Sequence, residues 1–463
     1  MKRMMLRLLA CLAASVAGTA AVARAGAPVG PPPVLFTHVR VIDGTGAPAQ
    51  PDRAVLVENG RIAAITASDP APPVPAGTTV LNLAGDTMIP GLMSDHSHVG
   101  LVQGATVDGG HFTRAVILAA LRQYEAYGVT TVTALGVTKS PLFDTLRREQ
   151  HAGTNAGADL FGVDQGISVP GGAPPDGMMH ADPGQILRPA TPKDARAAVD
   201  RMADEGTDLV KLWVDDFRNG VAGKPGLPIM SPAIWQAAIE EAHARGLRVA
   251  VHIHDLRYAR LMVAAHADIL AHGVRDQPVD QALIDAMKRA GTWYIPTIQL
   301  DEASYLYAAE PGLIDQPELA QGLDPALRAE FSDAAWRQKT LNAPLAEASR
   351  RAVAMNQQNL VRLVRAGVNV GFGTDSGAMP LRIPGYAEHR ELRLYVQAGL
   401  TPLEALSLAT SRAAALMKLD DRGSIAVGRR ADLVILGADP SADITAVDRI
   451  EQVWRGGVRG ASF

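Results

Sequence analysis

Between residues 88 and 422 the chain repeats one unit, a short apolar run rich in β-branched residues followed by a segment with helical spacing. Helix-like segments such as residues 233–245 and 352–366 are followed by Gly246 and Gly367, and glycine is a common helix stop. Repeated strand–helix units predict a (β/α)8 TIM barrel of the α/β class. The candidate strands are residues 88–98, 130–135, 159–163, 209–214, 248–252, 269–272, 292–296 and 368–374.

An open, doubly wound sheet is the alternative architecture for such a repeat. It would need a glycine-rich nucleotide loop after the first strand. The first candidate strand ends instead in the sequence Asp95-His96-Ser97-His98. The barrel is therefore the favoured interpretation.

The segments on either side of the repeat have a different character. Residues 34–87 contain β-like runs between turn residues, and the same pattern returns in residues 431–436 and 450–457. We therefore predict a small β-sandwich-like domain built from both chain ends. Its two parts would be residues 26–87 and 423–463, which flank the barrel at residues 88–422.

The first 25 residues have the features of a secretory signal peptide. Basic residues precede an apolar stretch at residues 8–22, and Ala23-Arg24-Ala25 offers a cleavage site before Gly26. This predicts a periplasmic or secreted protein with a signal peptide at residues 1–25. Membrane attachment is not expected after cleavage, since no second run approaches the ~18 apolar residues that a span needs. The only cysteine, Cys11, lies within this segment, so the mature protein would contain no disulfide.

The charges of the chain do not favour a nucleic-acid partner. The net charge is −4, and basic residues form no stripe interleaved with aromatic residues. A small-molecule substrate is the expected partner.

His96 and His98 stand two residues apart at the end of the first candidate strand. Residues i and i+2 of a strand point to the same face, so the two imidazoles would meet at one point, where a metal ion can bind them. Functional residues of TIM barrels lie at the carboxyl ends of the strands. Other candidate ligands lie in or at the ends of four further strand segments, and they are Lys211, His252, His272 and Asp375.

Taken together, these motifs resemble the metal-dependent amidohydrolase superfamily. The likeness is greatest to the branch of imidazolonepropionase-like proteins and zinc-dependent Xaa-Pro (prolidase-type) dipeptidases. The motifs that carry it are Ile89-Pro90-Gly91-Leu92, Asp95-His96-Ser97-His98, Val210-Lys211-Leu212, Ala271-His272-Gly273, Gly373-Thr374-Asp375-Ser376 and Gly428-Arg429-Arg430-Ala431-Asp432. The likeness covers nearly the whole predicted mature chain.

The resemblance implies a site for two divalent metal ions, most often zinc. His96, His98 and Asp375 would bind one ion, and His252 and His272 the other. Lys211 would bridge the two as a carbamate derived from CO2, because an ammonium repels a cation whereas a carbamate supplies two anionic oxygens. An alternative for this lysine is an ion pair with a nearby aspartate, namely Asp208, Asp215 or Asp216.

The function implied is that of an exported binuclear amidohydrolase. It would hydrolyse an amide bond of a dipeptide or N-acyl amino acid with a metal-bridging hydroxide, and Asp375 would serve as general base and acid. Alternatives with the same fold are cleavage of an ester, lactone, cyclic amide or phosphotriester. A non-catalytic homologue is a further alternative, although all six ligand-type residues are present.

The substrate contacts are less constrained by the sequence. His254 lies two residues beyond His252 and would face the same cavity if the strand continues, where it could stabilise an oxyanion; otherwise it points into the next loop. Arg382 and Arg390 are candidates to bind a substrate carboxylate. His180 lies in a long loop that could reach the site.

Residues 300–351 are longer than a single barrel helix requires. One interpretation is a lid over the active site that gates access. The other is an outer helical elaboration used for contact between copies in a homo-oligomer.

Overall fold

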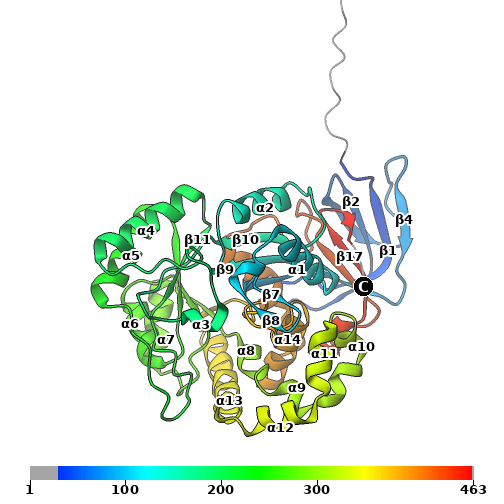
Figure 1. Cartoon of the computed structure of the whole chain (residues 1–463). Helices are drawn as coiled ribbons and strands as arrows, with labels where there is room; N and C mark the ends of the chain where they lie inside the picture. The colour runs from blue at the N-terminus through cyan, green and yellow to red at the C-terminus, as the bar shows by residue number, and fades with distance from the viewer. Residues whose placement is uncertain (1–29, 461–463) are drawn as a thin grey trace, which may run out of the picture.

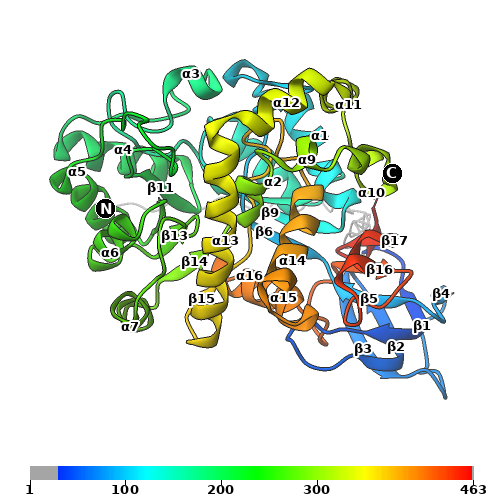
Figure 2. The ribbon, with the colours of Figure 1, turned by 90° about the horizontal axis from the view of Figure 1, so that it is seen from below.

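The computed structural model describes residues 30–460, so the predicted signal peptide lies outside the described residues. Strands from both chain ends form one eight-stranded sheet, in which blue and red strands lie together (Figures 1 and 2). Phe36 and Trp454 pack edge to face in its core, with ring centroids 5.1 Å apart. In spatial order the strands are β18 (Val458–Arg459), β17 (Ile450–Arg455), β16 (Leu433–Leu436), β5 (Thr87–Pro90), β1 (Val34–Val41), β2 (Gln50–Glu58) and β3 (Arg61–Ala67), and β4 (Thr79–Asn82) pairs with β1.

The middle of the chain contains eight parallel strands in chain order, which fall into two hydrogen-bonded runs. The first run is β10 (Asp159–Val163), β9 (Val129–Leu135) and β6 (Leu92–Ser97). The second is β11 (Leu209–Trp213), β12 (Arg248–His252), β13 (Ile269–Ala271), β14 (Trp293–Ile295) and β15 (Asn369–Val370). Between the runs the ladder is reduced to single bridges, Ile167 with Leu212 and Ser97 with Ser376.

Helices alternate with these strands and surround them in both ribbon views (Figures 1 and 2). The principal ones are α1 (Arg114–Ala126), α2 (Leu142–His151), α4 (Pro192–Glu205), α5 (Pro232–Ala244), α6 (Leu256–Ala264), α7 (Gln281–Ala290), α13 (Pro344–Arg365), α14 (Tyr386–Ala398), α15 (Pro402–Ser407) and α16 (Ala413–Met417). The strand–helix order confirms the predicted α/β class and TIM-barrel fold. Gly246 and Gly367 follow α5 and α13 with positive φ, as expected of helix stops.

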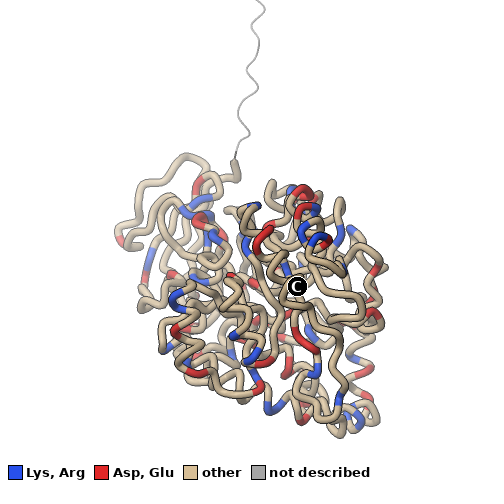
Figure 3. Tube along the Cα trace, turned by 90° about the vertical axis from the view of Figure 1, so that its left-hand side faces the viewer, with Lys and Arg blue, Asp and Glu red and all other residues tan. Residues whose placement is uncertain are grey.

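Short elements complete the described chain. A small hairpin, β7 (Val102–Gln103) and β8 (Thr106–Val107), follows β6, and α3 (Asp176–Met179) lies in the long loop after β10. Lysine and arginine are interspersed with aspartate and glutamate over the trace in Figure 3. Within residues 30–460, no helix combines the length and hydropathy needed to cross a membrane.

The first candidate strand, residues 88–98, divides into two strands that belong to different sheets. β5 joins the mixed sheet, and β6, the first barrel strand, begins only at Leu92. Gly91 separates them, and a Cβ at this position would lie 2.1 Å from Thr130 Oγ1 on the neighbouring strand. The sequence pattern missed this division because the apolar run is continuous across the glycine.

Residues 300–351 form a group of short helices with a core of their own. Tyr307 and Phe331 stack in it with ring centroids 4.3 Å apart, and Tyr127 and Tyr386 border it. The helices are α8 (Ile298–Glu302), α9 (Leu306–Ala309), η2 (Pro311–Asp315), α10 (Pro317–Ala320), α11 (Pro325–Ser332) and α12 (Ala334–Asn342), and they lead into α13.

Candidate metal centre

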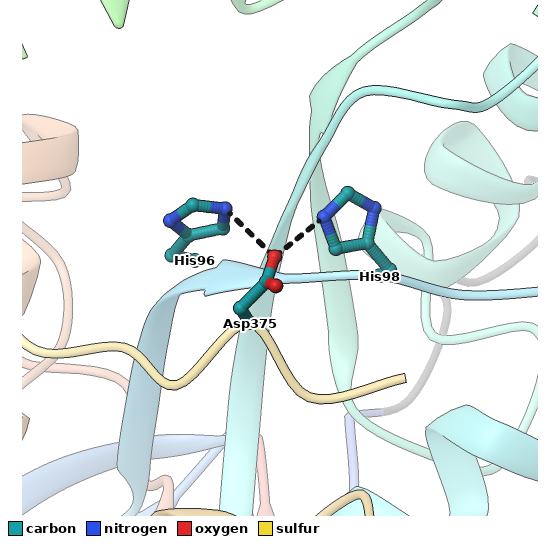
Figure 4. A group of neighbouring side chains, drawn as sticks. All are labelled: His96, His98 and Asp375. Carbon is teal, nitrogen blue, oxygen red and sulfur yellow. Dashed lines mark hydrogen bonds and ion pairs between the residues drawn. The ribbon is translucent and has the colours of Figure 1, made fainter. Parts of the chain in front are cut away.

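Two histidines and one aspartate converge where β6 ends and β15 is continued by a loop (Figure 4). His96 Nε2 lies 3.2 Å and His98 Nε2 3.0 Å from Asp375 Oδ1. All three residues are buried. The i, i+2 spacing predicted from the sequence therefore brings both imidazoles to one carboxylate.

A second group of ligand-type side chains lies beside this triad. The His272 ring centroid is 4.4 Å from that of His96 and 4.3 Å from that of His252. Lys211, at the middle of β11, lines the same cavity as these residues. The structure thus brings together all six side chains that the sequence indicated as metal ligands.

Two of these histidines are held by hydrogen bonds that leave Nε2 facing the site. His98 Nδ1 lies 3.0 Å from the carbonyl oxygen of Gly136, and His272 Nδ1 lies 2.8 Å from Thr297 Oγ1. Because a carbonyl can only accept, His98 Nδ1 is the donor, and in the neutral ring Nε2 carries the lone pair. A bond of this kind orients a histidine for metal ligation.

The backbone is turned at two of the candidate ligands. His272 has φ +92° and Asp375 φ +62°, a region that costs a non-glycine residue about 1 kcal/mol or more. His272 directly follows the last residue of β13, and Asp375 lies in the loop after β15.

Burial governs the electrostatics of this cluster. Desolvation, then the charge of Lys211, lowers the pKa of His96 to about 3, and desolvation lowers the pKa of Lys211 to about 7. Burial alone would raise the pKa of Asp375, but the charge of Arg382 and the neighbouring imidazoles of His96 and His98 hold this pKa well below its usual range. The environment therefore favours a neutral His96 and an ionised Asp375, which are the forms that bind a cation.

The unsatisfied polar atoms show that this cluster fits metal ions. Among residues 30–460, hydrogen-bond partners are lacking for both ring nitrogens of His96, for His252 Nε2 and for Lys211 Nζ, all of which are buried. Each such group costs about 1–3 kcal/mol when it is left without a partner. In addition, His98 Nε2 and Asp375 Oδ1 lie 3.0 Å apart, so one ion could contact both. Nitrogen and carboxylate donors suit a divalent transition metal.

Glu388 of α14 ties together the two segments that carry the triad. Its Oε1 accepts hydrogen bonds from Ser94 Oγ (2.9 Å), Thr374 Oγ1 (2.6 Å) and Ser376 Oγ (2.7 Å), and its Oε2 accepts one from the Gly385 backbone (2.8 Å). Sequence reasoning missed this residue. No single pattern marked it, because Thr374 and Ser376 alternate with Asp375 whereas Ser94 has the same strand parity as His96 and His98.

The predicted substrate contacts are distributed differently. Arg382 lines the cavity and forms a close ion pair with Asp375. Arg390 instead pairs through Nε and Nη2 with Glu302. His254 is buried, with Nδ1 2.7 Å from Asp255 Oδ1, and His180 is exposed. The described residues that line the cavity do not include Arg390, His254 or His180. The contacts of these three residues with a substrate remain predictions.

The loops after β10 and β11 contribute part of the lining of the cavity over the metal cluster. Among the described residues that line this cavity, Leu300 is the only one from the segment at residues 300–351. Arg275, three residues after His272, also lines the cavity, and sequence reasoning missed it. The apolar lining side chains are Val137, Pro174, Met178, Met179, Trp213, Phe217, Leu300 and Met379.

The comparisons with known proteins agree with this geometry. The Amidohydrolase family matches residues 87–459. Imidazolonepropionase from Mycolicibacterium smegmatis is 27% identical over 431 residues, which cover 87% of this chain and 89% of that protein. Imidazolonepropionase from Deinococcus deserti is 38% identical over 102 residues, only 21% of this chain and 25% of that protein.

A solved structure with the same fold supports this assignment. A Bifidobacterium longum protein assigned as a prolidase superposes with a TM-score of 0.72 and 26% identity, over 93% of this chain and 94% of that one. The family match spans most of the chain and includes every residue of the metal cluster. The chain therefore belongs to the amidohydrolase family of metal-dependent hydrolases.

Proposed function

We propose that this protein is an exported binuclear metal hydrolase that cleaves the amide bond of a dipeptide or an N-acyl amino acid. The observation that carries the proposal is the convergence of six buried ligand-type side chains on one cavity. Several of their polar atoms have no hydrogen-bond partner among residues 30–460. The similarity to a protein assigned as a prolidase supports the choice of bond.

Each candidate ligand has a part in this proposal. His96, His98 and Asp375 would hold one ion, and His252 and His272 the other. Zinc is the proposed metal, because imidazole and carboxylate ligands suit it. When bound, two such ions polarise a substrate carbonyl and lower the pKa of a water molecule.

Lys211 would join the two ions after reacting with CO2. Its neutral Nζ would attack the carbon of CO2 and release one proton to water, which gives an N-carboxylate whose single negative charge is shared by two oxygens. The side chain is 1% exposed, and no acceptor among the described residues hydrogen-bonds Nζ. This environment supports a neutral, reactive amine better than an ammonium, which would repel both cations.

Asp375 would move the proton during hydrolysis. The oxygen of water forms a bond to the carbonyl carbon, and the bond from that carbon to nitrogen breaks. The Asp375 carboxylate would accept the proton released by water and deliver it to the leaving nitrogen. The ion pair with Arg382 keeps this carboxylate ionised at the start of the cycle.

A cyclic amide is the second candidate substrate. It is favoured by the similarity to imidazolonepropionase from Mycolicibacterium smegmatis over most of both chains. The same residues would perform the same proton transfers on a ring amide.

The test is a substrate panel assayed with the metal-loaded protein, which starts at Gly26. Zinc and bicarbonate are supplied, and the panel contains dipeptides, N-acyl amino acids, cyclic amides, esters and lactones. We expect amide hydrolysis, two zinc ions per chain by elemental analysis, and a carbamate signal in ¹³C NMR after labelling with ¹³C-bicarbonate. Hydrolysis confined to esters and lactones would overturn the choice of bond, and one zinc ion without a carbamate would overturn the binuclear site.

A further inference from the structure

Arg275 is a buried arginine beside the candidate metal ligands. It follows β13 by four residues, and it lines the same cavity as His252 and His272. Its side chain is only 2% exposed. A guanidinium stays charged in proteins, so this position places a fixed positive charge at the wall of the cavity.

The hydrogen-bonding capacity of Arg275 is not used up by the protein. Within the described chain, its Nε and Nη1 have no hydrogen-bond acceptor. The closest carboxylate, that of Asp301, places Oδ2 3.3 Å from Nη1, and this oxygen also lacks a hydrogen bond to any described residue. A buried guanidinium with open donors is costly, and a planar carboxylate that accepts two parallel hydrogen bonds matches its geometry.

Other arginines near the site differ from Arg275 in their position or in their contacts. Arg382 shares the cavity, but it is engaged by Asp375, and Arg390 is engaged by Glu302. Arg218 lies in the loop after β11 and is 55% exposed at its side chain, 3.6 Å from Asp216. Among these arginines, Arg275 is the one that both lines the cavity and retains open donors within residues 30–460.

The rest of the cavity wall is largely apolar. Met178 and Met179 come from the loop after β10, Phe217 from the loop after β11, and Met379 from the loop that follows Asp375. Methionine side chains adapt to irregular apolar groups. The wall therefore suits an apolar substrate side chain next to the charge of Arg275.

We propose that Arg275 binds the free carboxylate of the substrate, so that the preferred substrates are N-acylated or N-terminally extended amino acids with an apolar side chain and an unblocked carboxylate. This inference rests on the proposed amide hydrolysis and deepens it. It assigns carboxylate recognition to Arg275 in place of Arg382 and Arg390, the two arginines indicated by the sequence.

The test compares N-acetyl-L-leucine with N-acetyl-L-leucinamide, which differ only in the carboxylate. We expect the wild-type protein to hydrolyse the acid with a kcat/KM about tenfold to a hundredfold higher, the range for charge-assisted hydrogen bonds. Arg275→Met should abolish this preference, mainly through KM. Arg275→Lys keeps the charge without the paired donors and should retain part of the preference.

A binding measurement complements the kinetics. In calorimetric titrations of the zinc-loaded protein, L-leucine should bind more tightly than L-leucinamide, and Arg275→Met should remove the difference. If Arg275→Met fails to fold because Asp301 loses its counter-charge, the double variant Arg275→Met/Asp301→Asn removes both charges, and circular dichroism checks its fold. Arg218→Met is the matched control, and it should leave the acid-to-amide ratio unchanged.

The failure of this inference differs from the failure of the proposed function. Equal hydrolysis of the acid and the amide by the wild-type protein would overturn the role of Arg275 while leaving amide hydrolysis intact. Retention of the preference in Arg275→Met, with loss in Arg382→Met, would overturn it in favour of Arg382. A protein that binds zinc and hydrolyses no amide in the panel would instead overturn the proposed function.

Discussion

Glu388 offers a sharp test of how the metal cluster is positioned, because its fully buried carboxylate touches both ligand-bearing segments. Glu388→Ala would leave three hydroxyls and the Gly385 backbone N–H without this acceptor. Each orphaned buried donor costs about 1–3 kcal/mol, but hydroxyls can rotate to other acceptors. We therefore expect the free energy of unfolding to fall by about 3–5 kcal/mol, which includes the cost of the space that the shorter alanine side chain leaves.

Glu388→Gln is the milder and more informative change. The amide keeps one acceptor oxygen for the three hydroxyls, but its NH2 group cannot accept the Gly385 N–H, so a loss of about 1–3 kcal/mol is expected. Because Ser94, Thr374 and Ser376 flank the triad, zinc affinity should also fall about tenfold to a hundredfold. Urea unfolding of the metal-free protein measures the first effect, and competition with a chromogenic chelator measures the second.

Glu125→Gln is the matched control for this prediction. Glu125 is also a buried glutamate, and it accepts a hydrogen bond from the Gly157 backbone and lies 3.5 Å from Arg455, outside the metal cavity. It should lower stability without changing zinc affinity. Identical zinc affinities for Glu388→Gln and the wild-type protein would refute the positioning argument and leave Glu388 with a purely structural role.

Three further predictions follow from other contacts. Lys211→Ala should bind one zinc ion per chain or none and lose amide hydrolysis, as measured by elemental analysis and the substrate panel; two zinc ions would contradict a bridging role. Arg365 lowers the pKa of Glu404 from 4.5 to about 2, so this group stabilises the fold above pH 4.5 and its contribution disappears as the pH falls towards 2. Glu404→Gln should therefore lower the free energy of unfolding by only about 1 kcal/mol at neutral pH, because the pair is partly exposed, and by less in acid. Urea unfolding at several pH values measures this difference. Finally, the mature protein from a periplasmic or culture fraction should begin at Gly26 by N-terminal sequencing, and an intact Met1 in that fraction would contradict cleavage.

The barrel strands and the metal cluster were predictable because local rules and the global fold agree there. His96, His252 and Lys211 lie in or at the end of strands that the apolar pattern marks, and a parallel barrel collects such positions at one face. Glu388 and Arg275 were not predictable in the same way. Their importance depends on which side chains reach them across the fold, and neither periodicity nor spacing carries that information.

Two further features could not be predicted from the sequence. They are the division of the first strand and the choice of segments that line the cavity. A single glycine, Gly91, separates β5 from β6, and its effect depends on the approach of Thr130 from another strand. The segment at residues 300–351 could be predicted to be helical cover. This segment contributes only Leu300 to the described cavity lining, whereas Met178 and Met179 come from the loop after β10. Both facts depend on tertiary packing of segments whose sequences have no regular period.

The mixed sheet bears on the order in which the protein can assemble during its synthesis. β16 pairs with β5 from Leu433 opposite Pro90 to Leu436 opposite Thr87, and the Gly91 backbone donates to the carbonyl of Asp432. The strand that leads into the His96 segment thus takes its neighbour from beyond Asp375, the last candidate ligand along the chain. A nascent chain that has emerged only as far as Asp375 has all its ligand residues but lacks the strand that braces the first of them. Synthesis of β16, rather than of the last ligand, is therefore the earliest moment at which this site can be completed.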